Sequence, residues 1–138
     1  MIKRLALIAL IFYALPCSAA KLEITEAWIK NLPMVVPMRA GYMDISNNQA
    51  QTIKIERLQS EAFARIEIHR SVEKDGLMSM QPVSVLAISS GETVRLAPGG
   101  FHLMMMNPLK TLVPGNKVVV TIGYDDQSTQ DIEMMVRK

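Results

Sequence analysis

Two histidines and two methionines have the residue types and spacing in this sequence that could do chemistry. His69 is followed by ten residues and then Met80, and 21 further residues separate Met80 from His102, with Met104 two positions beyond. The chain of 138 residues contains no other histidine. Imidazole and thioether are soft, uncharged ligands, a set that suits Cu(I) better than most biological metals. These residues therefore indicate a copper site.

The dipeptide Asp75-Gly76 is a strong hairpin signal between two strand-like segments. If it forms a two-residue loop, Met80 faces Ser71 across the hairpin. His69 then lies two residues along from Ser71 on the same face. Diagonal neighbours of this kind are about 7–8 Å apart and within reach of long side chains. This register predicts that the Met80 sulfur and the His69 ring converge.

His102 and Met104 are two residues apart on another predicted strand, so both side chains point the same way. The alternation predicts that Leu103 and its odd-numbered neighbours point into the core. Pro98-Gly99-Gly100 allows a turn just before His102, which predicts a position near a rim. A rim position would leave a bound ion accessible to another protein.

The chain has 11 methionines, and a methionine in an all-β protein is more often core filler than ligand. Both histidines could equally be ordinary strand residues in a metal-free β-sandwich that binds other proteins. Five methionines are therefore interpreted as packing or surface residues: Met34, Met38, Met43, Met134 and Met135.

The segments that carry these residues read as short strands separated by turn residues, which predicts an all-β sandwich or barrel. No segment has a helical apolar period. The predicted strands are 22–25 with its continuation 27–29, 40–46, 53–58, 63–72, 83–88, 93–96, 101–106, 117–124 and 131–136.

Residues 1–20 are interpreted as a signal peptide, because Lys3 and Arg4 precede an apolar run that ends in Ser18-Ala19-Ala20. An N-terminal membrane anchor and a lipoprotein at Cys17 are the alternatives, although Pro16 is a poor residue before a lipidated cysteine. The mature chain is expected to be one domain, 21–138, and to contain no cysteine.

Removing residues 1–20 lowers Lys plus Arg from 15 to 13, which equals the 13 Asp and Glu. A neutral domain without a basic stripe argues against nucleic acid as a partner. Without another long apolar run, no membrane span is expected after the signal. A blue-copper centre needs a cysteine thiolate, which the mature chain lacks. No nucleophile–base pair, phosphate loop or zinc motif favours an enzyme.

The spacing His69–x10–Met80–x21–His102–x–Met104 resembles the signature of the periplasmic copper chaperones that serve the Cu(A) centre of cytochrome c oxidase. The likeness covers most of the mature chain. Arg70 is a departure, because family members often have methionine directly after the first histidine. The similar segments are Ala40-Gly41-Tyr42 with Asn47, Asp75-Gly76, Met80-Gln81-Pro82-Val83, and residues 98–104.

The resemblance implies a cupredoxin-like Greek-key β-sandwich that binds Cu(I) through His69, Met80, His102 and Met104. It also implies copper handover in the periplasm to an oxidase subunit or assembly factor. Cu(II) remains a second form, since it prefers nitrogen and oxygen and Glu67 shares the His69 face. Copper sequestration shares the site without the handover. A monomer is expected, although exposed methionines could let copper bridge two chains.

Overall fold

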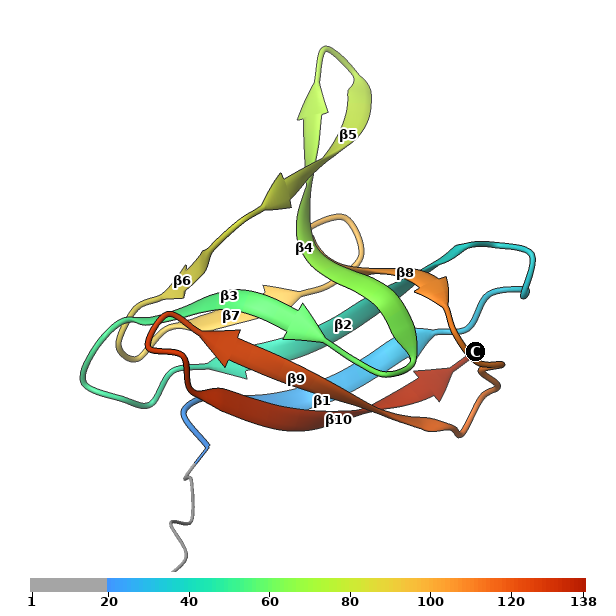
Figure 1. Cartoon of the computed structure of the whole chain (residues 1–138). Coiled ribbons are helices and arrows are strands. Elements are labelled where there is room, and N and C mark those ends of the chain that lie inside the picture. The colour runs from blue at the N-terminus through green and yellow to red at the C-terminus, as the bar shows by residue number, and fades with distance from the viewer. Residues whose placement is uncertain (1–19) are drawn as a thin grey trace, which may run out of the picture.

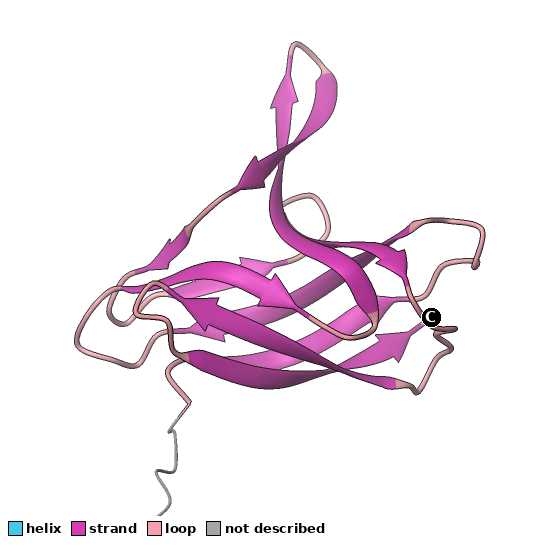
Figure 2. Cartoon of the chain, in the orientation of Figure 1, coloured by secondary structure: helices cyan, strands magenta, loops and turns pink. Residues whose placement is uncertain are grey.

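The computed structural model describes residues 20–138, and every regular element in that range is a β-strand (Figure 2). The all-β prediction is confirmed. The strands are β1 Glu23–Lys30, β2 Met38–Ser46, β3 Ile53–Gln59, β4 Phe63–Lys74, β5 Leu77–Val83, β6 Leu86–Ile88, β7 Thr93–Leu96, β8 Phe101–Pro108, β9 Lys117–Tyr124 and β10 Thr129–Arg137.

The strands form one continuous sheet in the order β5-β4-β8-β7-β2-β1-β10-β9-β3-β6, with β8 also pairing with β2. This sheet curls so that its inner face encloses a single core, and β4 comes back beside β3 (Figure 1). Alternation along each strand drives the closure. On β3, for example, Ile53 and Ile55 are buried while Lys54 and Glu56 are exposed.

The core lies directly beneath the strands that carry the predicted site. Leu103 and Met105 of β8 are fully buried, as predicted from the alternation around His102. Gly41 of β2 lets the backbone approach them closely. A Cβ at Gly41 would lie 3.1 Å from the Met105 sulfur and 3.2 Å from the Leu103 Cβ, tighter than ordinary packing.

One predicted strand is wrong. Residues 83–88 were expected to be a single strand, but the structure divides them between the end of β5 and the separate strand β6. β5 pairs with β4 and β6 pairs with β3, so the chain changes partners between Val83 and Leu86. Periodicity along the chain does not reveal a change of partner.

The predicted signal peptide, 1–20, lies outside the described residues except for Ala20, so its cleavage remains a prediction. In residues 20–138 there is no helix long and apolar enough to cross a membrane.

Candidate metal centre

Met80 lies on a hairpin formed by β4 and β5, which stands away from the body of the sandwich (Figure 1). Asp75 and Gly76 form its turn with positive φ values of 54° and 76°. Met80 pairs with Ser71, so the predicted register is confirmed. The local turn chemistry determines where the thioether sits along the arm.

The two histidines face each other directly, because β4 pairs with β8 and His69 is the partner of His102. Their ring centroids are 6.0 Å apart and the ring planes are inclined at 50°. An imidazole nitrogen lies about 2 Å from a metal it binds, so rings at this separation can share one ion. Met104 pairs with Glu67, one step along the same face.

Hydrogen bonds leave one free lone pair on each imidazole. His69 Nε2 lies 2.8 Å from a Glu67 carboxylate oxygen and donates to it in the neutral ring, while His69 Nδ1 is buried with no partner among the described residues. His102 Nδ1 donates to the Gly100 carbonyl at 3.2 Å, which leaves Nε2 unprotonated in the neutral ring. A hydrogen bond on one ring nitrogen is the usual way to prepare the other for a metal.

A surface hollow of about 300 Å³ connects most of these ligands to solvent. His69 does not line it. The soft side chains that line it are Met38, Met80, His102 and Met104, and the rest of the wall is Leu32, Val36, Arg39, Ala40, Tyr42, Ser71, Pro98 and Gly99.

The ligands differ in how much of each is exposed to solvent. His69 and His102 are only 9% and 6% exposed, whereas Met80 is 61% exposed. His69 and His102 form the next-to-last pair of the β4–β8 ladder, which ends at Arg70 and Phe101, so both buried rings lie near one end of these paired strands. Access to the His102 imidazole is therefore through the hollow, with Met80 on the outside.

Besides Arg39 in the wall of the hollow, two arginines of β4 lie near the site, and both contact groups other than the imidazoles. Arg70 follows His69 by one residue and so lies on the opposite face of β4, with its guanidinium 5.5 Å from the centre of the Phe101 ring. Arg65 pairs with Glu67 at 3.1 Å and donates to the Met106 sulfur at 3.3 Å. Together Arg65, Glu67 and His69 form a chain of polar contacts along one face of β4.

The methionines interpreted as packing or surface fall into three groups. Met43 and Met134 are buried in the core, and Met34 and Met135 are exposed. Met38 is different, because it lines the hollow beside Met104. A single strand pattern could not reveal this, since it depends on which strand pairs with β8.

Within residues 20–138, no cluster of three or more His, Cys, Asp or Glu side chains is placed to hold a metal ion. A metal centre at His69 and His102 therefore depends on the neighbouring thioethers.

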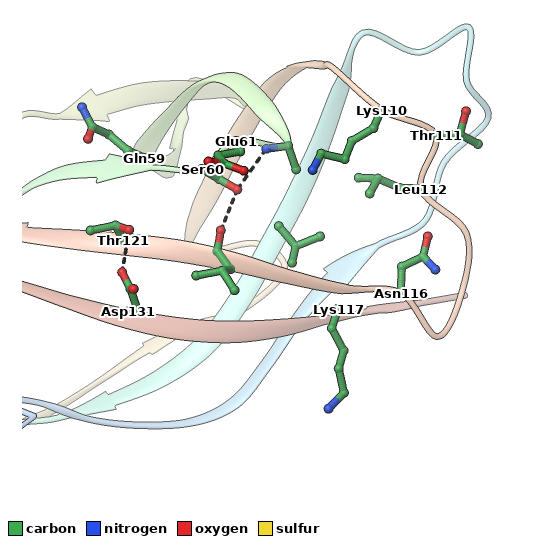
Figure 3. A pocket seen from close by; sticks show the side chains of 13 residues that line it. Gln59, Ser60, Glu61, Lys110, Thr111, Leu112, Asn116, Lys117, Thr121 and Asp131 are labelled. Atoms are coloured by element: carbon green, nitrogen blue, oxygen red, sulfur yellow. Dashed lines mark hydrogen bonds between the residues drawn. The ribbon is translucent and has the colours of Figure 1, made fainter.

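A larger hollow of about 770 Å³ lies elsewhere, between residues 59–62, which end β3 and precede β4, and residues 110–121 (Figure 3). Two of its hydroxyls are used internally: Ser60 donates to the Val119 carbonyl at 2.6 Å, and Thr121 donates to Asp131 at 2.6 Å. This surface offers structural hydrogen bonds rather than a second set of metal ligands.

A family model described as "Putative lipoprotein LpqE-like" matches residues 22–136. The chain belongs to the LpqE-like family. This LpqE-like protein is 32% identical over 116 residues to the "Putative lipoprotein Lxx21020" of Leifsonia xyli subsp. xyli (strain CTCB07), across 83% of this chain and 69% of that relative.

Solved structures show the fold of this LpqE-like protein. The copper-bound PCuAC domain from PmoF2 has a TM-score of 0.72 at 17% identity, covering 86% of this chain and 93% of that domain. The Cu(I) form of DR1885 from Deinococcus radiodurans has a TM-score of 0.67 at 24% identity, covering 92% of this chain and 82% of that protein. The predicted cupredoxin-like β-sandwich is confirmed.

Proposed function

We propose that this LpqE-like protein is a copper chaperone that binds Cu(I) through His69, Met80, His102 and Met104. The direct pairing of His69 with His102, at 6.0 Å between ring centroids, is the observation that carries the proposal. Met80 and Met104 add thioethers at the hollow beside this pair. Two structural neighbours are described as a copper-bound domain and a Cu(I) protein, which supports copper as the cargo.

Cu(I) is favoured over Cu(II) by the ligands near the pair. Cu(II) prefers nitrogen and oxygen, yet residues 20–138 contain no preassembled cluster of three His, Cys, Asp or Glu ligands. Glu67 is already engaged by His69 and by Arg65. A Cu(II) form with Glu67 would need that carboxylate to leave both partners.

A neutral ligand set suits a carrier. Thioethers bind without losing a proton, so the occupied site keeps the single positive charge of Cu(I). Partial exposure through the hollow lowers the cost of that charge. The described site contains no thiolate, so a cysteine-containing acceptor such as the Cu(A) centre of cytochrome c oxidase would draw the ion away. Handover outside the cytoplasm agrees with relatives described as lipoproteins.

The test is a Cu(I) titration of the purified protein against a chromophoric chelator. Wild type is expected to bind one equivalent, and His102→Ala/Met104→Ala should weaken binding at least about 100-fold, because metal ligands matter no less than the outer contacts that orient them. The matched control is Met78→Ala/Met135→Ala, which removes two exposed methionines outside the ligand set. Unchanged affinity in the His102/Met104 variant would contradict this ligand set, and no Cu(I) binding by wild type would favour the metal-free interaction module.

Delivery and sequestration are separated by an acceptor. Cu(I)-loaded protein is mixed with a reduced dithiol acceptor, and the copper on each partner is measured after separation. Transfer of copper to the acceptor supports a chaperone. Retention of copper by this protein would contradict delivery and favour copper storage or tolerance.

A further inference from the structure

We propose that Met38 is a fifth soft ligand of this site, which replaces Met80 on Cu(I) during copper exchange. The inference rests on the proposed Cu(I) function. Met38 lines the same hollow as Met80, His102 and Met104, although it lies on β2, outside the predicted ligand spacing.

The register brings Met38 to the far side of the hollow from Met80. On β2, Ala40 pairs with Met104 and Met38 pairs with Met106. Met38 is therefore a diagonal neighbour of Met104, at about 7–8 Å and within reach of long side chains. Soft donors thus continue across the face from β5 through β4 and β8 to β2.

Met106 shares this face but is a poorer candidate. The Arg65 guanidinium donates to its sulfur at 3.3 Å, which places a positive charge at the atom that would bind Cu(I). The sulfur of Met38 has no such contact among the described residues. Met38 is also 39% exposed, so its thioether can move without unpacking the core.

The Met38 backbone is fixed by hydrogen bonds from a buried arginine, and no side-chain hydrogen bond of this kind reaches the Met80 backbone among the described residues. Arg39 is 2% exposed, and its Nη1 donates to the carbonyls of Met38 at 2.9 Å and Val36 at 2.8 Å. These bonds direct Nη1 to the backbone, while Arg39 Nε is buried without a partner among the described residues. Met80 instead lies on the projecting arm, on the terminal strand of the sheet. The Met38 thioether is therefore presented by a strand inside the sandwich, and the Met80 thioether by a projecting hairpin with fewer contacts.

The exchange needs no redox partner. The copper–sulfur bond to Met38 forms as the copper–sulfur bond to Met80 breaks, and copper stays Cu(I). Both thioethers are neutral, so neither a proton nor an electron moves. The outcome is an ion held by His69, His102, Met104 and Met38, with Met80 released for an incoming acceptor.

The test is a double-mutant cycle on Cu(I) affinity, measured by chelator competition. Leucine is used because Met and Leu are close in volume and such exchanges are usually tolerated. Met38→Leu is expected to cost about twofold or less in wild type but at least about tenfold in Met80→Leu, because coupled residues depart from additivity. Met135→Leu is the matched control, since Met135 is 41% exposed and does not line the hollow.

A direct readout uses protein labelled with 13C at the methionine methyl groups. In the Met80→Leu variant, one equivalent of Cu(I) should shift the Met38 methyl resonance and leave that of Met135 unchanged. This inference would be overturned if Met38→Leu lowered Cu(I) affinity equally in wild type and in Met80→Leu, or if the Met38 methyl resonance did not shift. Cu(I) binding by wild type would still support the proposed function in that case. No Cu(I) binding by wild type would overturn both.

Discussion

At the scale of single residues, Glu67 is the side chain that orients the His69 ring. Its carboxylate accepts from His69 Nε2 at 2.8 Å and receives Arg65 at 3.1 Å. The proton is thereby held on Nε2, and the lone pair stays on the buried Nδ1. Glu67 thus acts as a positioning residue for the proposed centre.

Glu67→Ala is expected to lower Cu(I) affinity about 10- to 100-fold, the usual cost of losing a contact that orients a ligand. Chelator competition measures the affinity, and 15N NMR of the metal-free protein should show His69 shifting from the Nε2–H form to a mixture of tautomers. Glu73→Ala is the control, because Glu73 is exposed on the same strand face but lies beyond Ser71. An unaltered His69 tautomer would contradict the assignment.

At the scale of elements, the β4–β5 hairpin sets the position of Met80. Its two turn residues both have positive φ, a geometry that glycine adopts without cost and aspartate tolerates. A Cβ at Gly76 would meet nothing within 4 Å, so a substitution there introduces backbone strain without a clash. The arm can therefore be perturbed separately from the core.

Gly76→Val should strain the turn by about 1–3 kcal/mol, because a β-branched residue is placed at positive φ. The arm then frays, and Cu(I) affinity is expected to fall roughly tenfold, which corresponds to about 1.4 kcal/mol. The thermal midpoint, followed by circular dichroism, should change little because Gly76 contributes nothing to the core. Asp75→Asn keeps a residue suited to this turn and should behave as wild type. A Gly76→Val variant with wild-type affinity would show that Met80 needs no intact turn.

At the scale of the whole molecule, the start of the described chain is fastened to its final hairpin. The Gln130 side-chain oxygen accepts from the backbone N–H groups of Lys21 at 3.0 Å and Leu22 at 3.2 Å, and from the Tyr124 hydroxyl at 2.7 Å. Burial, aided by the nearby Asp126 carboxylate, raises the pKa of Tyr124 to about 12 from its ordinary 10.0.

Because the folded state favours neutral Tyr124, its contribution to stability is complete below about pH 10 and is lost as pH rises from 10 to 12. Tyr124→Phe should cost about 1 kcal/mol at pH 8 through the lost hydrogen bond. That gap is expected to narrow or reverse by pH 11, as measured by urea unfolding at both values. A constant gap would show that Tyr124 does not titrate with unfolding.

Local sequence rules predicted a large part of this architecture. Alternation placed Leu103 in the core and His102 on the other face, and Asp75-Gly76 predicted the register that pairs Met80 with Ser71. These succeed because a strand's two-residue period and a two-residue turn are short-range properties of the backbone. The spacing of the two histidines and two methionines was visible in the sequence, although their role as metal ligands remains a proposal.

Only the tertiary structure decided which distant strands pair. The pairing of β4 with β8 sets His69 opposite His102, and the pairing of β2 with β8 brings Met38 to the hollow. The burial of both imidazoles and the division of residues 83–88 between two partners follow from the same assembly. Strand partners are selected by burial and hydrogen bonding summed over the whole sheet, which no local pattern encodes.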